Sequence, residues 1–535
     1  MMAHTMMDTP LTIDLIVDRA ERWMGDGEVV SRRPDRSLHR TTYGAIVERA
    51  RQLARALVAA GIGRGERVAT LMWNHAEHME AYFGIPLAGA VTHTLNLRLH
   101  PDEIAFIATD ARDRFLIVDD VLLPLLDKIV AAGAKFERVI VVGTAGAHVG
   151  YESFLETGAD GVTLPALAET DPLGVCYTSG TTGKPKGVVY SHRSTVLHTL
   201  VAALPDSLSL SRADILLPVV PMFHVNAWGL PFVAAMVGAK LVFPGPFLDP
   251  PSLLDLLVSE RVTVAAGVPT IWLGIREALD ANPGKWTLQP GLRMIVGGSA
   301  APEQLIRDFD RLGMTLLHAW GMTETSPIGL VSRVPPHLAD AGDAVCYQLR
   351  AKQGVPPPLV DVCVRNDTGE VPRDDRTSGE LLVRGPWVAA SYAGGHTPER
   401  WTDDGWFRTG DVARMDAHGF VQLTDRVADL IKSGGEWIAS QELENVLMGH
   451  PAVREAAVIG VPHPKWSERP LAAVVLKPGA QVTADELRAH LADRFPKFWL
   501  PDAVVFVETI PRTSAGKFKK TELRDTFHAH YANAR

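Results

Sequence analysis

Apolar residues recur at helical spacing in some early stretches of the chain and form short continuous runs in others. Residues 42–61 place apolar side chains at helical spacing and end on a glycine, and residues 78–90 also predict a helix. The runs 66–73, 115–120 and 138–143 predict strands. This alternation indicates a doubly wound, mainly parallel sheet, which places ligands at the carboxyl ends of its strands.

The pattern changes after about residue 355, where short strands are joined by Gly and Asp turns. These strands are expected at 360–366, 379–386 and 420–426. With 535 residues, the chain exceeds the size at which one hydrophobic core stops growing, so two or more domains are expected. The residues beyond 430 suffice for a separate α+β domain. Its expected helices are 440–450, 483–495 and 520–531, and its expected strands are 454–461, 471–477 and 503–508.

Net charge and cysteine content indicate which binding partners and which cellular compartment to expect. The net charge is −9 and both signs are dispersed, so we expect no nucleic-acid partner and favour a small diffusible substrate. Cys176, Cys346 and Cys363 lack metal-ligand spacing, and their odd number leaves one unpaired in any disulfide scheme, which favours a reducing cytoplasm. Acidic residues near the N-terminus stand where a signal peptide has its apolar core, so no export is expected.

Residues 215–239 contain no Lys, Arg, Asp or Glu and are long enough to cross a bilayer. However, three prolines interrupt this stretch, and His224 and Asn226 lie near its centre. We therefore expect no integral membrane span here. The pattern predicts a buried strand, a loop and a helix that line an apolar cavity.

A loop at residues 178–187, TSGTTGKPKG, combines glycines, hydroxyl groups and two lysines. Glycines let successive backbone N–H groups converge on one anion while lysines neutralise it, so the expected ligand is phosphate. The loop departs from the pattern G-x-x-x-x-G-K-[ST], because Thr178 replaces the first glycine and Pro185 follows Lys184. A kinase-type magnesium arrangement on this loop is therefore not expected.

The loop resembles the signature of the acyl-adenylate-forming superfamily, which comprises acyl-CoA synthetases, firefly-type luciferases and the adenylation domains of peptide synthetases. The superfamily's other motifs follow in order: GMTETSP at 321–327, GELLVRGP at 379–386, WFRTGD at 406–411, DRVADLIKSGGEWI at 425–438 and PRTSAGK at 511–517.

This resemblance implies an architecture of α/β and α+β parts. The large N-terminal domain, residues 1–424, would contain the doubly wound sheets and the acid, ATP and Mg²⁺ sites. A hinge at residues 425–429 would lead to a small mobile α+β C-terminal domain, residues 430–535. ATP and a carboxylic acid would meet between the two domains.

The resemblance also implies how the nucleotide is held. Glu324 and Thr178 would bind Mg²⁺, a hard cation that prefers oxygen ligands, and the acceptor-only carboxylate of Asp411 would bind the ribose hydroxyls. Adenine would lie between the turn at 297–302 and the stretch around Trp320. The residues expected to bind ATP or AMP are Thr178, Ser179, Gly180, Thr181, Thr182, Gly183, Lys184, Lys186, Val225, Gly298, His318, Ala319, Trp320, Thr323, Asp411, Arg426 and Trp437.

Two lysines resemble the superfamily's alternating catalytic lysines. Lys517 would stabilise the adenylation transition state, and Lys432 would approach when the small domain rotates for the thiol step. The loop of Gly434, Gly435 and Glu436 would lie on the CoA side, where glycines permit close backbone approach. At the hinge the chain departs from many relatives, because Ala428 stands where they carry Lys or Asp, which puts the rate of domain alternation in doubt.

The segment 221–232, PMFHVNAWGLPF, resembles the acyl site of bacterial fatty-acid CoA ligases. Trp228 would gate an apolar tunnel, and His224 would lie near the carboxylate as a third catalytic residue. This segment contains no Lys or Arg that could bind a second carboxylate. The absence of such a cation favours an apolar monocarboxylic acid.

The resemblance predicts an ATP-dependent acid–CoA ligase that forms acyl-AMP, AMP and pyrophosphate, most closely similar to medium- to long-chain fatty-acid CoA ligases. A ligase for short acids such as methylmercaptopropionate, and an acyl-AMP ligase with a non-CoA acceptor, stay open. A non-catalytic lipid-binding protein would need none of Lys517, Glu324 and Asp411. A homodimer is mildly preferred.

Overall fold

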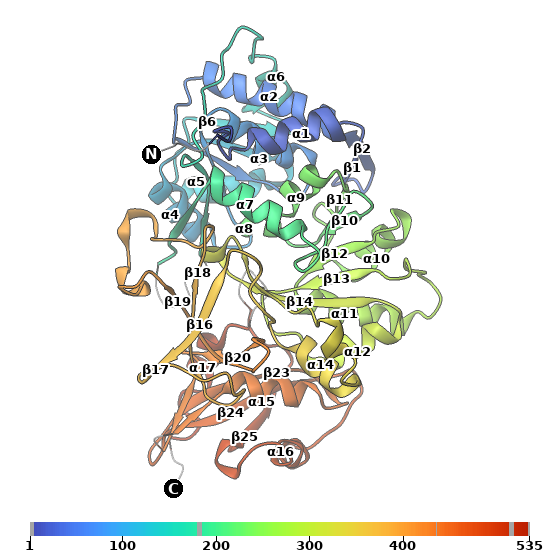
Figure 1. The fold of residues 1–535 in the computed structure, drawn as a ribbon, viewed down its shortest axis with the longest axis vertical. Coiled ribbons are helices and arrows are strands. Elements are labelled where there is room, and N and C mark those ends of the chain that lie inside the picture. The colour runs from blue at the N-terminus through green and yellow to red at the C-terminus, as the bar shows by residue number, and fades with distance from the viewer. Residues whose placement is uncertain (1–4, 179–183, 435, 513–517, 533–535) are drawn as a thin grey trace.

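Two mainly parallel sheets form the large N-terminal part of the chain (Figure 1). The computed structural model describes residues 5–178, 184–434, 436–512 and 518–532. The first sheet has the order β7 (Val149–Gly150), β6 (Arg138–Val142), β5 (Asp113–Asp119), β3 (Arg67–Leu71), β4 (Val91–Thr94), β8 (Pro172–Tyr177) and β9 (Gly187–Ser191). The second has the order β15 (Ile328–Val331), β14 (Thr315–Gly321), β13 (Arg293–Val296), β12 (Val264–Gly267), β10 (Ile215–Pro218), β11 (Lys240–Phe243), β1 (Glu28–Arg32) and β2 (Leu38–Thr42).

Helices fill the space between these sheets and cover their outer faces. The inner group is α1 (Asp14–Met24), α2 (Tyr43–Ala59), α3 (Ala76–Leu87), α6 (Tyr151–Leu155), α7 (His192–Ala203), α8 (Val225–Trp228) and α9 (Leu230–Val237). The outer group is α4 (Pro101–Ala111) and α5 (Leu123–Ala131) on the first sheet, and α10 (Pro250–Ser259), α11 (Pro269–Ala281) and α12 (Glu303–Arg311) on the second. In β13, Ile295 joins the inner core while Met294 and Val296 join the outer core, because successive strand residues face opposite sides. The predicted doubly wound architecture is confirmed.

A third, antiparallel sheet packs beside β14 and carries part of the site. Its order is β17 (Gly369–Glu370), β16 (Asp361–Asn366), β18 (Gly379–Arg384), β19 (Phe407–Met415) and β20 (Val421–Arg426). Helices α13 (Pro336–Ala339) and α14 (Asp343–Ala351) precede it. Single 3₁₀ turns lie at Asp120–Leu122, Thr323–Thr325, Ala393–Gly395, Pro398–Arg400 and Lys497–Trp499.

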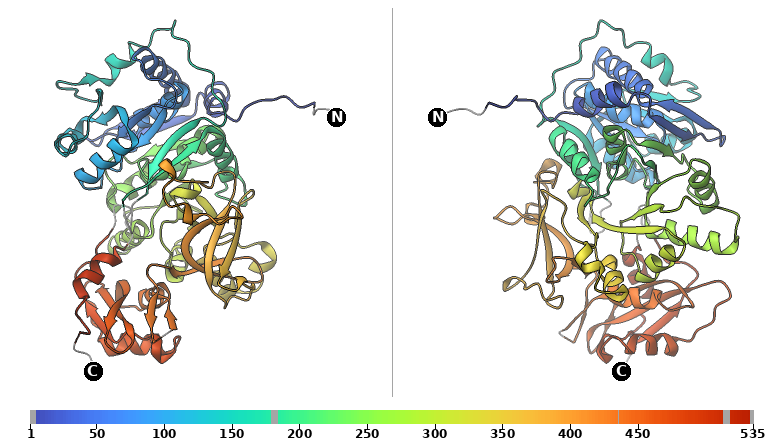
Figure 2. Two further views of the ribbon diagram at one scale, coloured as in Figure 1. Left: turned by 90° about the vertical axis from the view of Figure 1, so that its left-hand side faces the viewer. Right: turned by 45° about the vertical axis from the view of Figure 1, so that its right-hand side comes forward.

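The last part of the chain folds around a sheet of its own, at the bottom of Figure 1 and in both views of Figure 2. The sheet has the order β22 (Glu436–Ile438), β21 (Ile431–Ser433), β24 (Ser467–Leu476) and β23 (Val453–His463), and β25 (Ala503–Phe506) pairs with β24. Helices α15 (Ser440–Met448) and α16 (Ala484–Ala492) cover one face and α17 (Lys520–Phe527) covers the other. The expected small α+β unit is confirmed, while the exact domain boundaries stay a prediction.

The charge-free stretch 215–239 forms β10, a loop with α8, and then α9. Throughout the part of the chain that the structure describes, helices are too short or too polar to span a bilayer.

A cluster of charged side chains is buried at the amino end of α3. The Nδ1 atom of His75 lies 2.9 Å from Glu77 Oε2, and its Nε2 atom lies 2.8 Å from Asp119 Oδ1. Burial alone would lower the pKa of His75, but the two carboxylates raise it to about 10. His75 is therefore charged at neutral pH.

Candidate active site

A cavity of about 860 Å³ opens where the carboxyl ends of β10, β12, β13 and β14 meet the third sheet and the C-terminal unit. This is the edge of a parallel sheet at which ligands bind in doubly wound folds. Most of the described residues singled out in the sequence line this cavity: Thr178, Lys184, Lys186, His224, Val225, Trp228, Gly298, His318, Ala319, Trp320, Thr323, Glu324, Asp411 and Arg426.

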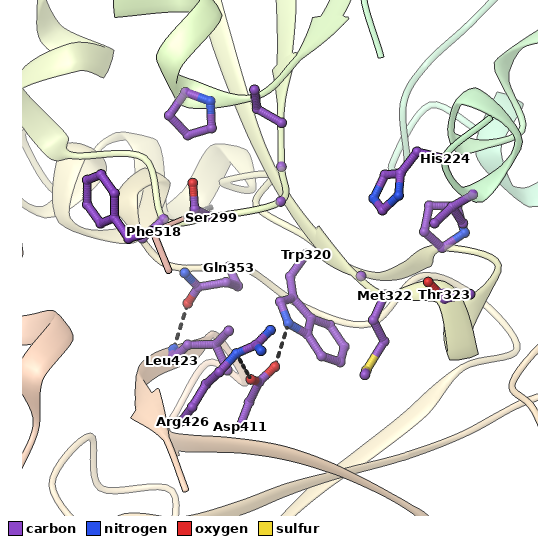
Figure 3. A pocket seen from close by; sticks show the side chains of 18 of the residues that line it. His224, Ser299, Trp320, Met322, Thr323, Gln353, Asp411, Leu423, Arg426 and Phe518 are labelled. Carbon is purple, nitrogen blue, oxygen red and sulfur yellow. Dashed lines mark hydrogen bonds and ion pairs between the residues drawn. The ribbon is translucent and has the colours of Figure 1, made fainter. Parts of the chain in front are cut away.

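Three of these residues form a polar cluster on one wall (Figure 3). The indole Nε1–H of Trp320 donates to Asp411 Oδ2 at 3.0 Å, and Arg426 Nε lies 3.4 Å from Asp411 Oδ1. Asp411 and Arg426 face each other because β19 and β20 are paired in that register. Trp320 is 9% and Asp411 6% exposed, so the orientation of this carboxylate is fixed by packing as well as by its donors. In the view of Figure 3, His224 and Phe518 lie on opposite sides of Trp320.

A second cluster surrounds the 3₁₀ turn Thr323–Thr325. The hydroxyl of Tyr392 donates to Glu324 Oε1, and the hydroxyl of Tyr190 donates to the Thr323 carbonyl at 2.9 Å. Burial and the neighbouring carboxylate raise the pKa of Tyr392, so its hydroxyl stays protonated as a donor. Lys186 Nζ lies 5.2 Å from the ring centroid of Tyr392, which brings the end of the glycine-rich loop close to Glu324.

The two ends of that loop are joined by two hydrogen bonds between Thr178 and Lys186. Thr178 N–H donates to the Lys186 carbonyl at 2.9 Å, and Lys186 N–H donates to Thr178 Oγ1 at 3.3 Å. The candidates Ser179, Gly180, Thr181, Thr182, Gly183, Gly435 and Lys517, and the side chain of Glu436, lie outside the described residues.

The adenine-side candidates lie where β13 and β14 end. His318 Nδ1 is 3.1 Å from the Ala351 carbonyl, and burial lowers the pKa of His318 to about 4, so this imidazole is neutral. Gly298 has a φ of 86°, in the left-handed region that favours glycine. The turn at 297–302 can therefore fold close to the end of β14.

The apolar arm of the cavity is shaped by a left-handed turn. Val225, Asn226, Ala227 and Trp228 all have positive φ, between 44° and 59°. Such residues cost about 1–2 kcal/mol each for L-amino acids, and strained backbone of this kind concentrates at functional sites. The turn sets the Trp228 ring against Gly297, where an added Cβ atom would lie 3.1 Å from the ring. Apolar side chains continue this wall: Leu208, Val219, Val220, Phe223, Leu248, Val268, Ile271, Leu273 and Ile295.

The structure does not bring all the candidates together. Lys432, Gly434 and Trp437 are absent from the described cavity wall, and Trp437 is 54% exposed. In contrast, Arg512 and Phe518, which flank the segment 513–517, do line the cavity. The described residues on either side of the segment 513–517 therefore face the cavity, whereas Lys432, Gly434 and Trp437 lie outside it.

Several cavity residues were missed in the sequence. Tyr392 reaches Glu324, Arg400 Nη2 donates to the Thr409 carbonyl at 2.9 Å, and Gln353 Oε1 accepts from Leu423 N–H at 2.6 Å. Arg98 also lines the cavity, and its guanidinium lies 5.8 Å from the ring centroid of Phe223. The segment 221–232 contains no Lys or Arg, so the cation on this wall comes from the loop that follows β4. These residues lie in loops outside the motifs, and no spacing signal marks them.

The structure combines a large domain with two wound sheets and a small domain that closes a cavity lined by acidic and cationic side chains. This architecture and site define the adenylate-forming class of enzyme. The chain belongs to the AMP-binding enzyme family, whose model matches residues 17–393, and the AMP-binding enzyme C-terminal domain matches residues 442–517.

Named relatives match along the whole chain. The chain is 48% identical to a long-chain-fatty-acid–CoA ligase of Thermus thermophilus, covering 99% of this chain and 98% of the relative. It is 43% identical to a medium-chain-fatty-acid–CoA ligase of Ectopseudomonas oleovorans, covering 98% of each. It is also 43% identical to a 3-methylmercaptopropionyl-CoA ligase of Ruegeria pomeroyi, covering 98% of this chain and 99% of the relative. The fold matches a crystal structure of the anthranilate CoA ligase AuaEII with anthranoyl-AMP, with a TM-score of 0.86 at 24% identity, covering 98% of this chain and 99% of that chain.

Proposed function

We propose that this chain converts medium- or long-chain fatty acids into their CoA thioesters. The chain is an AMP-forming acid–CoA ligase: a carboxylate oxygen attacks the α-phosphorus of ATP, pyrophosphate leaves, and the CoA sulfur then attacks the acyl carbon and AMP leaves. The observation that carries the choice of acid is one cavity in which the apolar arm at Trp228 adjoins the polar cluster at Asp411.

The charged residues of the site would bind different parts of ATP and the acid. Lys184, Lys186 and the rest of their loop would hold the β- and γ-phosphates, while Asp411 would accept hydrogen bonds from the ribose. Both steps concentrate negative charge, so catalysis would depend on positioning and on cations aimed at that charge. Lys517 would supply the cation for adenylation, and Lys432 would act in the thiol step. His224 would lie near the substrate carboxylate.

The donors present fit Mg²⁺. Glu324 is 4% exposed and lies near Lys186, close to the described end of the phosphate loop. Across the residues that the structure describes, no three His, Cys, Asp or Glu side chains converge as a metal cage. Mg²⁺ in nucleotide sites is commonly bound by one or two protein oxygens, phosphates and water, so Glu324 with Thr178 would suffice. The ion would neutralise phosphate charge.

Chain-length preference follows from the apolar wall. Each buried methylene contributes about 0.8 kcal/mol, so four more carbons contribute about 3 kcal/mol, on the order of a hundredfold in affinity. The runner-up acid is a short one such as methylmercaptopropionate, which the Ruegeria relative supports. An acceptor other than CoA is the other alternative. A cytoplasmic location, suggested by cysteine content, and a homodimer stay predictions.

The test is release of pyrophosphate and AMP with ATP and Mg²⁺ across monocarboxylic acids from propionate and methylmercaptopropionate to palmitate, with and without CoA. CoA-dependent turnover that peaks at medium or long chains is expected. A peak at short acids would transfer the assignment to the runner-up. Release that ignores CoA would indicate another acceptor.

A further inference from the structure

The loop between β4 and α4, residues 95–100, carries a cation that belongs to none of the sequence motifs. Leu97 and Leu99 pack into the core beneath α4, while Arg98 lies between them, is exposed and lines the active-site cavity. Arg98 N–H donates to Asn96 Oδ1 at 3.0 Å, and Leu99 N–H donates to the Asn96 carbonyl at 3.1 Å. The leucines and this turn therefore fix the loop with Arg98 at the cavity wall.

This loop leaves the first sheet beside the glycine-rich loop. Strands β4 and β8 are parallel neighbours, and near their carboxyl ends Thr94 Oγ1 lies 3.4 Å from Cys176 Sγ. Loops that follow neighbouring parallel strands emerge at the same edge of the sheet, where doubly wound folds bind ligands. Arg98 and Thr178, from these two loops, both line the cavity.

Helix α4 joins the same two loops. Before the glycine-rich loop, the Tyr177 hydroxyl donates to Asp110 Oδ2 at 2.6 Å. After it, Lys184 Nζ lies 5.2 Å from the ring centroid of Phe106. Both partners belong to α4, which begins directly after residues 95–100. The described ends of the proposed phosphate loop are therefore packed against the element that Arg98 precedes.

The other two cations at this edge also lie against aromatic rings. The Arg98 guanidinium is 5.8 Å from the ring centroid of Phe223, which is 3% exposed, and Lys186 Nζ is 5.2 Å from that of Tyr392. A ring face attracts and orients a cation but carries no net charge that would neutralise it. Arginine stays protonated, and its planar fork of donors matches phosphate oxygens. The edge thus presents three oriented positive charges to the cavity.

We propose that Arg98 binds the β- and γ-phosphates of ATP, as a third cation beside Lys184 and Lys186. The inference rests on the proposed function and deepens it. When the carboxylate oxygen bonds to the α-phosphorus, the bond from that phosphorus to the bridging oxygen breaks, and its electron pair leaves with pyrophosphate. Arg98 stabilises this charge on the leaving group. AMP lacks both phosphates, so Arg98 contributes nothing to AMP binding.

Calorimetric titration of the full chain measures the dissociation constants of ATP, pyrophosphate and AMP, each with Mg²⁺. Arg98→Gln should raise the constants for ATP and pyrophosphate about tenfold and leave that for AMP within twofold. Arg98→Lys keeps the charge but loses the fork, so its constants should lie between those of the wild type and Arg98→Gln. In turnover assays, KM for CoA and for the acid should change less than threefold.

Arg36→Gln is the matched control. Arg36 is exposed, its guanidinium lies 4.1 Å from the ring centroid of Phe247, and it is absent from the described cavity wall. This control therefore removes the same kind of ring contact at another place, and all three dissociation constants should stay within twofold of the wild type. Because Arg98 and Arg36 are both exposed, we expect each variant to fold, and thermal unfolding would verify this.

Equal loss of ATP and AMP affinity in Arg98→Gln, or unchanged affinity for ATP and pyrophosphate, would overturn the inference. A rise confined to KM for CoA would assign this cation to the CoA phosphates, and a rise confined to KM for the acid would assign it to a carboxylate; either would also overturn it. Absence of acyl-AMP formation by the wild type on every acid would instead refute the proposed function. Pyrophosphate titration does not depend on the acid, so the two failures are distinguishable.

Discussion

Replacing Trp320 with phenylalanine removes one hydrogen-bond donor and leaves an aromatic ring in the cavity wall. The lost bond joins the indole Nε1–H to Asp411 Oδ2 at 3.0 Å. A hydrogen bond to a charged acceptor contributes about 1.5–3 kcal/mol. Because Arg426 remains 3.4 Å from the other carboxylate oxygen, we take the lower end, which corresponds to about tenfold in the dissociation constant of ATP.

Calorimetric titration of ATP and Mg²⁺ into the Trp320→Phe variant would measure this change. Trp286→Phe is the matched control, because Trp286 donates the same kind of bond to Asp255 Oδ1 at 2.8 Å on the exposed surface, outside the cavity. An ATP affinity within twofold of the wild type in Trp320→Phe, or an equal loss in Trp286→Phe, would refute the reasoning that Asp411 is positioned for the nucleotide.

Three further changes have distinct expected outcomes. Tyr392→Phe removes the donor to Glu324 and should raise the Mg²⁺ concentration for half-maximal activity about tenfold, measured by Mg²⁺ titration at saturating ATP; an unchanged requirement would contradict a metal role for Glu324. His75→Gln should destabilise the fold more at neutral pH than at alkaline pH. The raised pKa of His75, about 10 against an ordinary 6.5, contributes stability that is complete below pH 6.5 and lost as pH rises through 10, with an upper limit of about 5 kcal/mol. Urea unfolding at pH 7 and pH 10 should therefore show a smaller difference between wild type and variant at the higher pH, and a constant difference would refute the charged assignment. Gly297→Ala would set a Cβ atom 3.1 Å from both the Trp228 ring and the Ala319 carbonyl, and should lower kcat/KM for fatty acids at least tenfold. An unchanged kcat/KM for fatty acids would contradict an acyl site at Trp228.

The fold was largely predictable because its sheets are buried on both faces. Continuous apolar runs in β5 and β6, and helical spacing in α2, are strong local signals that tertiary packing reinforces. The unit after residue 430 was predictable for the same reason, since β23 sends alternate side chains into two cores. The observed helices and strands differ from the predicted ones only at their ends, because hydrogen bonding at the termini does not follow the apolar periodicity.

Site residues that belong to sequence motifs were predictable. Site residues whose positions depend on how distant elements pack together were not. Asp411 and Trp320 come from different sheets, and their bond depends on how the third sheet packs beside β14. The left-handed turn at Val225–Trp228 has no local signal, because its residues are ordinary helix or strand formers. The place of Trp437 relative to the cavity depends on the orientation of the small domain, so its nucleotide role stays a prediction.

The most direct test of the central claim is a single-turnover experiment with ATP labelled at the α-phosphate, Mg²⁺ and a medium- or long-chain fatty acid. Without CoA, quenched samples should contain acyl-AMP equimolar with enzyme, and added CoA should convert it to acyl-CoA and labelled AMP. Labelled ADP in place of AMP, or AMP without an acyl-AMP that CoA consumes, would contradict the account.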